Sequence, residues 1–179
     1  MIEYENIIKN WIKNYVIKFD WCPFAHESIS DDQIEFITLN NINENNYKKT
    51  VNTFLTLTNK TQMILFIEDL FIQSFEQMND LNDDLDYLNK KNKFDLLSIS
   101  FHPRFQFAHH QFDDRINFVN RSPLPFFHIF KRDTFSHLTK NINGKDISIK
   151  NEKEINLIPD KKWEEMIKGL DEMTSRHKK

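Results

Sequence analysis

The residues best suited to chemistry gather in one segment of this chain, residues 100–132. The segment makes up less than a fifth of the 179 residues, yet it holds four of the five arginines, four of the seven histidines and three of the five prolines. Histidine moves protons near neutral pH, arginine binds carboxylates and phosphates through paired hydrogen bonds, and proline fixes the direction of the backbone. Their concentration predicts that this segment builds a small-molecule site.

The arginines favour contact with an anion. The chain has 19 lysines but only 5 arginines, in a composition rich in asparagine and isoleucine. Lysine can serve wherever charge alone is needed, whereas a site that needs a planar, bidentate fork requires arginine. We therefore expect Arg104 and Arg121 to anchor a carboxylate or a phosphate. The structural alternative is that the arginines clamp loops to Asp113 and Asp114.

The tetrapeptide Asn120-Arg121-Ser122-Pro123 points to the same chemistry. Prolines stiffen the backbone, so a rigid loop can present an amide, a guanidinium and a hydroxyl in one direction. These three groups complement a carboxylate or phosphate, which makes Asn120, Arg121 and Ser122 candidate ligand-binding residues. In the alternative interpretation the Asn and Ser side chains bond to nearby backbone in a turn, and Arg121 meets an acidic helix end.

Two histidines are candidate proton-transfer groups. His102 lies at the end of a predicted strand and is held extended by Pro103, and His128 lies within the next predicted strand. Either could act as a general acid or base in a polar pocket. The alternative for both is a structural imidazole held by hydrogen bonds.

Cys22 is the only cysteine, and Pro23 follows it. If the N-terminal helix ends here, the thiol lies at a negative helix end. If a new turn starts at Pro23, Cys22 is its N-cap, where the helix dipole favours the thiolate. The sequence leaves open a nucleophile, a metal ligand, and a buried thiol packed among Trp21, Phe24 and Phe19.

The signal for a metal is weak. Cys22 or His26 could join the two candidate histidines, His102 and His128, in a set of zinc-like ligands. However, the chain has neither a C-x-x-C pair nor an H-x-x-x-H spacing with a glutamate. We therefore predict no metal site and no cofactor, with zinc as the weaker alternative.

Hydrophobic periodicity predicts the elements that position these residues. It predicts helices over residues 4–19 and 47–58, one long helix or two nearly collinear helices over 70–88, and a helix from Pro159-Asp160 onward. It also predicts strands over 33–39, 62–68, 94–101 and 126–132, a short helix over 132–141, and a turn or exposed hairpin over 142–150. Residues 102–125 show no clear periodicity, and connections of that length in compact domains are usually functional or disordered. Their phenylalanines and prolines argue against disorder.

This order of elements predicts an α/β fold in a single compact domain, residues 1–179. We expect a small four-stranded mixed, mainly parallel sheet, with an N-terminal helix, crossover helices and a C-terminal helix. In such sheets ligands bind outside the carboxyl ends of the strands, which is where His102 and the long connection begin.

Composition narrows the class of protein. With 39% apolar and 28% charged residues the chain is typical of a globular domain. A net charge of -3 provides no basic field for a phosphate backbone, so we expect no nucleic-acid partner. Charges throughout the N-terminal segment argue against a signal peptide or membrane span, and a lone cysteine fits a reducing compartment. We therefore expect a cytoplasmic protein with no membrane partner.

Three segments carry a family resemblance: "WCPFAH", "SFHPRFQFA" and "NFVNRSPLPFFHIFKRDTF". Together they resemble the domain-of-unknown-function family numbered 1415, over roughly residues 4–139, with residues 140–179 as an extension. The resemblance implies a single intracellular domain and supplies no activity to carry over to this chain. Its motif positions here are Cys22, Pro23, Phe24, His102, Pro103, Asn120, Arg121, Ser122, Pro123, Pro125 and His128. The chain departs from the family pattern at Phe105 and Phe118, where tyrosine is common, and at His109-His110.

These observations support a small-molecule enzyme or enzyme-like pocket. In this hypothesis Arg104 and Arg121 anchor an anionic metabolite, His102 or His128 transfers a proton, and Cys22 lies nearby. All these groups must then converge on one hollow. Two alternatives remain, a non-catalytic module that binds the same metabolite and an interaction protein whose motifs only fix the fold.

Overall fold

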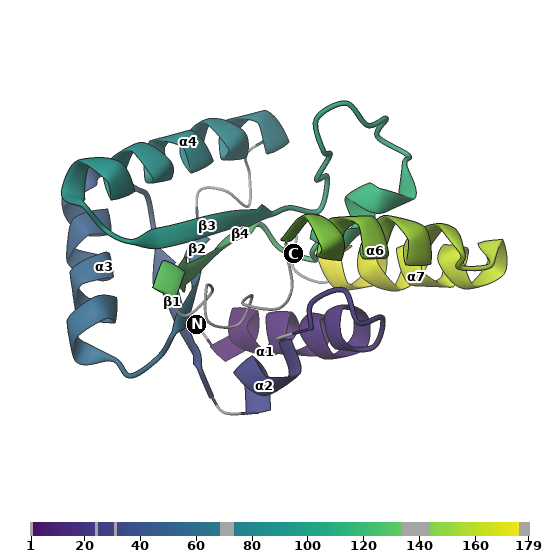
Figure 1. The fold of residues 1–179 in the computed structure, drawn as a ribbon, viewed down its shortest axis with the longest axis horizontal. Helices are drawn as coiled ribbons and strands as arrows, with labels where there is room; N and C mark the ends of the chain where they lie inside the picture. Colours follow the sequence, from purple (N-terminus) through teal and green to yellow (C-terminus); the bar gives the residue numbers. More distant parts are fainter. Residues whose placement is uncertain (1, 24, 31, 69–73, 134–143, 176–179) are drawn as a thin grey trace.

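The computed structural model describes residues 2–23, 25–30, 32–68, 74–133 and 144–175. Its elements are α1 (Ile2–Trp11), the π-helix η1 (Ile12–Ile17), α2 (Ala25–Ser30), β1 (Ile34–Leu39), α3 (Glu44–Leu57), β2 (Gln62–Ile67), α4 (Phe75–Asn92), β3 (Leu96–Phe101), the 3-10 helix η3 (Arg115–Asn120), β4 (Phe126–Lys131), α6 (Gly144–Asn156) and α7 (Asp160–Ser175). Figure 1 shows the sheet between a layer formed by α3 and α4 and a layer that contains α1 and α2.

The predicted four-stranded mixed sheet is confirmed, with the strand order β1-β2-β4-β3. β1, β2 and β3 run in one direction, as expected for a mainly parallel sheet. β4, however, lies between β2 and β3 and is antiparallel to both, so two of the three strand pairings are antiparallel. In the resulting register His128 lies opposite Ile64 of β2 and Ile99 of β3.

The sheet separates two hydrophobic cores because successive side chains of a strand point to opposite faces. On one face Met63, Leu65, Phe127 and Ile129 pack with buried residues of α3 and α4. On the other face the alternate strand residues pack against α1, η1, η3, α6 and α7; these include Ile64, Phe66 and Phe126. β2 is buried on both faces, which explains its continuous apolar run.

Helix capping and one hydrogen bond between helices stabilise the α3–α4 layer. Asn43 caps α3 and Ser74 caps α4, each in a capping box in which the cap side chain and the third helical residue exchange hydrogen bonds. Tyr47 of α3 donates its hydroxyl to Asn89 Oδ1 of α4 at 2.9 Å, and burial raises the pKa of that phenol. One side of the sheet is thus a closed core.

Two predicted elements differ from the structure. The turn or hairpin over 142–150 is wrong, because the described part of this range belongs to α6. Ile147 and Ile149 alternate like strand residues, but only Ile147 contributes to an inward helix face, while Ile149 is 56% exposed. The helix over 4–19 is interrupted by π-helical turns from Ile12. Most of the short helix predicted over 132–141 lies outside the described residues.

One of the two glycines of the chain is required by close packing. A Cβ atom at Gly169 in α7 would lie 2.6 Å from the Tyr15 hydroxyl, which donates to the Met166 carbonyl at 3.3 Å. Glycine is therefore the residue that lets α7 approach η1, although it is a poor helix former.

We predict that Gly169→Ala destabilises the protein by about 1–3 kcal/mol through overpacking. In a Tyr15→Phe background the same substitution should lose this penalty and gain up to about 1 kcal/mol from helix propensity. Urea unfolding of the wild type, the two single variants and the double variant measures the coupling between Gly169 and Tyr15. Equal effects of Gly169→Ala in both backgrounds would show that the hydroxyl does not set this contact.

Candidate functional site

The candidate site is a cavity of about 350 Å³ on the α1–α2 face of the sheet. Its floor consists of strand side chains, among them Ile64, Ile99 and His128, and its walls come from α1, η1, α2, η3 and α6. Most of the lining is apolar or aromatic. The cavity therefore lies along β4, across the sheet face, rather than only beyond the carboxyl ends of the strands as predicted.

A chain of three neutral polar side chains runs into this cavity. Gln62, the first residue of β2, donates its amide nitrogen to Ser28 Oγ at 2.5 Å. The amide oxygen of Gln62 lies 2.8 Å from His128 Nε2. Gln62 and Ser28 are buried, and His128 is partly buried with its ring 3.9 Å from that of Phe130. The hydrogen bonds fix the orientation of the imidazole on an otherwise apolar floor.

His128 is neutral at physiological pH. Burial disfavours the charged imidazolium and lowers the pKa of His128 to about 3. No carboxylate lines the described part of the cavity to offset that effect. An imidazole of this kind forms hydrogen bonds but is a weak base near pH 7.

Cys22 and Asn120 line the same cavity as His128. Cys22 lies between η1 and α2, and its carbonyl accepts from the Ala25 amide at 3.2 Å, so it precedes a new turn rather than ending a helix. Asn120 donates its side-chain amide to the Ser100 carbonyl at 3.2 Å. Phe24 of the same motif lies outside the described residues.

His102 does not line this cavity. It is 6% exposed, its Nδ1 accepts the Arg104 amide at 3.0 Å, and its ring lies 5.6 Å from that of Phe75. These contacts fix the turn after β3. The structural alternative for this residue, an imidazole held by hydrogen bonds, is therefore the arrangement observed.

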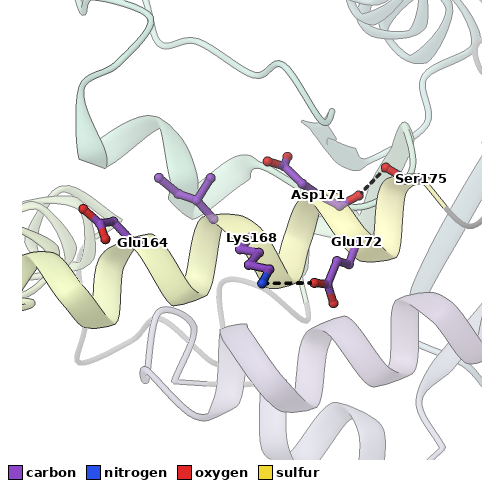
Figure 2. Close-up of a pocket in the computed structure, with 6 residues that line it drawn as sticks. Glu164, Lys168, Asp171, Glu172 and Ser175 are labelled. Atoms are coloured by element: carbon purple, nitrogen blue, oxygen red, sulfur yellow. Dashed lines mark hydrogen bonds and ion pairs between the residues drawn. The ribbon is translucent and has the colours of Figure 1, made fainter.

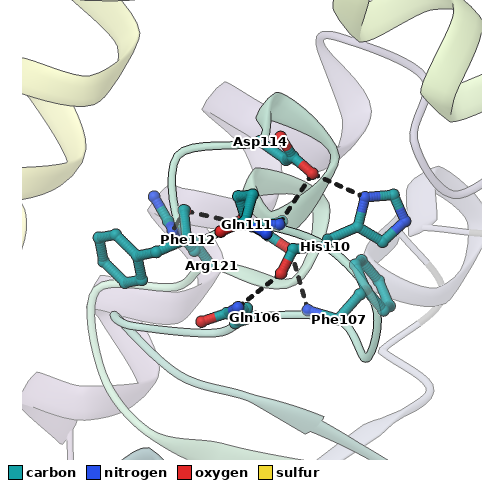
Figure 3. A network of polar contacts seen from close by, with 8 residues as sticks. Gln106, Phe107, His110, Gln111, Phe112, Asp114 and Arg121 are labelled. Atoms are coloured by element: carbon teal, nitrogen blue, oxygen red, sulfur yellow. Dashed lines mark hydrogen bonds and ion pairs between the residues drawn. The ribbon is translucent and has the colours of Figure 1, made fainter.

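The two arginines also lie outside the cavity lining. Arg121 donates from Nε to the Phe105 carbonyl at 3.2 Å and from a terminal nitrogen to the Phe112 carbonyl, and its guanidinium stacks 4.3 Å from the Phe112 ring centre. Figure 3 shows Arg121 beside Phe112 within this network. The exposed Arg104 lies 5.8 Å from the same ring. The partners of Arg121 are thus backbone carbonyls rather than the Asp113 and Asp114 carboxylates.

Ser122 and Asn117 hold the connection that approaches β4. Ser122 is fully buried and donates its hydroxyl to the Leu124 carbonyl at 2.6 Å. Asn117, also fully buried, accepts the Phe107 amide at 2.9 Å and donates to the Gln111 carbonyl at 2.6 Å. Sequence reasoning identified Ser122 but missed Asn117, whose only signal was an amide side chain in a segment otherwise rich in phenylalanine.

A second hollow lies on α7, where Figure 2 shows Glu164, Lys168, Asp171 and Glu172 along one helix. Lys168 and Glu172 are 4.0 Å apart, one helical turn from each other. These charged side chains form the solvated face of a single helix. Among the residues that the structure describes, no three His, Cys, Asp or Glu side chains come together as metal ligands.

Comparison with known proteins gives one match. The family described as "Protein of unknown function (DUF1415)" matches residues 3–165. The chain belongs to this family. The match extends beyond residues 4–139, over which the motifs resemble it, and includes α6 and the start of α7. No curated protein and no solved structure matches the chain. Within the described ranges, no helix has the length and apolar character needed to cross a membrane.

The family motifs divide into two groups in space. Cys22, Pro23, Asn120 and His128 line the cavity. His102, Arg121 and Ser122 bond to the backbone of the connection between β3 and β4. The first group can contact a ligand in the cavity, and the second holds one wall of it in place.

Replacing Arg121 by lysine should destabilise the protein by about 1–2 kcal/mol, because one ammonium cannot reproduce the planar contacts to two carbonyls and a ring. Arg104→Lys is the matched control, and we expect it to change stability by less than about 0.5 kcal/mol because Arg104 is exposed. Urea unfolding measures both. Equal losses in the two variants would contradict the clamp assigned to Arg121.

His128 should make stability depend on acid pH. Its folded-state pKa lies below the unfolded value of about 6.5, so the unfolded chain binds the proton first. The full stability is present above about pH 7 and falls as the pH drops toward 3, by about 2–3 kcal/mol at pH 4.5.

The His128→Phe variant should lose this part of the pH dependence in chemical unfolding measured between pH 7 and 4.5. The control His109→Asn removes an exposed imidazole at a residue with positive φ, which asparagine tolerates. If the wild type and His128→Phe lost the same free energy of unfolding between pH 7 and 4.5, the assigned contribution of His128 would be refuted.

Proposed function

We propose that this protein binds a small, uncharged and mainly apolar molecule in the cavity over β4. The observation that supports this is the lining itself: about 350 Å³ of space bounded by apolar, aromatic and neutral polar side chains, with no Lys, Arg, Asp or Glu among the described residues of its wall. A charged ligand would lose its hydration here without gaining a counter-charge.

Binding is favoured over proton transfer by the state of the imidazole. Efficient general acids and bases have pKa values near the working pH, whereas desolvation holds the pKa of His128 at about 3. Cys22 remains a candidate nucleophile because it lines the cavity, but no cationic side chain beside it in the described wall favours a thiolate. A non-catalytic binding module therefore fits the lining better than an enzyme does.

An anionic ligand of the kind expected from the arginines would bind at a different place. Arg104 and Arg121 meet at Phe112, and an anion anchored there would lie against the connection between β3 and β4, outside the cavity. The two hypotheses thus predict opposite preferences for the charge of a ligand. A matched pair of neutral and anionic probes separates them.

We predict that 4-propylanisole, a neutral probe, raises the unfolding midpoint by about 3–5 °C at ten times its Kd and slows alkylation of Cys22. The anion 4-propylbenzoate should do neither. Differential scanning fluorimetry measures the midpoint, and mass spectrometry measures alkylation by iodoacetamide.

Ala25→Phe should abolish both effects, because Ala25 lines the cavity and the larger ring occupies it. Ala108→Phe is the matched control at an exposed residue and should retain them. Stabilisation by the benzoate alone, lost in Arg121→Lys, would replace this proposal by the anion site. Binding of neither probe would refute the cavity as a site for such molecules.

A further inference from the structure

We infer that the ligand of this cavity carries an uncharged hydroxyl, as in a phenol or an alcohol, and donates it to Nδ1 of His128. This inference rests on the proposed function, since it names the class of molecule that the same cavity accepts. It depends on which atoms of the lining already have hydrogen-bond partners.

The amide of Gln62 determines where the imidazole carries its proton. The amide nitrogen is used toward Ser28, so the amide oxygen faces His128 Nε2. With the amide in this orientation its carbonyl oxygen accepts from Nε2, which is then the protonated nitrogen. A neutral imidazole has one N–H, which leaves Nδ1 with a lone pair and the role of acceptor.

Nδ1 of His128 has no hydrogen-bond partner in the described structure, while the ring lines the cavity. The rest of the ring contacts phenylalanines, with Phe130 at 3.9 Å and Phe101 at 6.5 Å between ring centres. A ligand that supplies a donor to this atom forms its hydrogen bond in mainly apolar surroundings, where such a bond is stronger than in water. The floor of the cavity therefore presents an acceptor, Nδ1 of His128, to a hydrogen-bond donor of the ligand.

Two further acceptors belong to the same wall. Asn120 uses its amide nitrogen on Ser100, which leaves its Oδ1 without a partner among the described residues. Asn151 uses its amide nitrogen on the Trp21 carbonyl, and its buried Oδ1 is likewise unpartnered. The wall also offers donors, since the indole nitrogens of Trp11 and Trp21 have no hydrogen-bond partner in the described structure. A hydroxyl both donates and accepts, so it complements a wall that presents both kinds of atom.

The charge of the lining excludes the other common donors. An amine is cationic near neutral pH, and the described wall offers no carboxylate to pair with it. An amide has both a carbonyl and an N–H to desolvate, so it costs more than a hydroxyl to place in this mainly apolar lining. A hydroxyl on an apolar body is the donor that remains.

The test compares two isomers, 4-butylphenol and 4-propylanisole, which have the same atoms and nearly the same shape. Only the phenol can donate. We expect calorimetry to show binding about three- to tenfold tighter for the phenol, the range that one net hydrogen bond provides. In His128→Phe the ratio should fall to about one, while in the control Ile99→Val, at the register partner of His128, both affinities should fall together and the ratio should persist.

Nitrogen-15 NMR of labelled histidine tests the contact without a substitution. In the free protein Nε2 should appear protonated and Nδ1 unprotonated, and the phenol should shift the Nδ1 resonance while the anisole leaves it in place. A protonated Nδ1 in the free protein, or an unchanged Nδ1 resonance with bound phenol, would overturn the inference.

The outcomes separate this inference from the proposed function. If both isomers bind with equal affinity and both are excluded by Ala25→Phe, the cavity binds neutral molecules but His128 does not select a donor. If neither isomer binds, the proposed function and the inference fail together.

Discussion

The hydrogen bond between Gln62 and His128 is the interaction on which the character of the cavity depends. It joins β2 to β4 through side chains on one face of the sheet, at 2.8 Å. The same amide bonds to Ser28 and so ties α2 to the start of β2, a central strand of the sheet. Without this bridge His128, the only ionisable side chain among the described strand residues of the cavity floor, would lose the partner that orients its imidazole.

Much of the fold could be predicted from local pattern. The four strands lie within two residues of the predicted ranges, because alternation and continuous apolar runs report burial directly. The central place of β4 could not be predicted, since strand order depends on contacts between distant segments. α6 was missed because two isoleucines two residues apart imitate a strand, and because the inward residues of α6 include the polar Asn151.

The structure brings some of the predicted site residues together and keeps others apart, and the reason lies in what each side chain bonds to. Cys22, Asn120 and His128 do share one cavity. His102, Arg121 and Ser122 instead bond to backbone atoms of their own connection, and no sequence pattern distinguishes such a partner from a ligand. Gln62 and Ser28 were overlooked because a polar residue at the start of a strand or in a short helix usually faces water.

Successive side chains of β4 point to opposite faces of the sheet, so they contribute to two separate parts of the molecule. Phe127 and Ile129 belong to the layer of α3 and α4, whereas Phe126, His128 and Phe130 face the cavity. In the proposed function, substitutions on the cavity side change which molecule fits, while the opposite layer continues to hold the sheet together. Such a scaffold would let ligand choice diverge among relatives without compensating changes in the α3–α4 core.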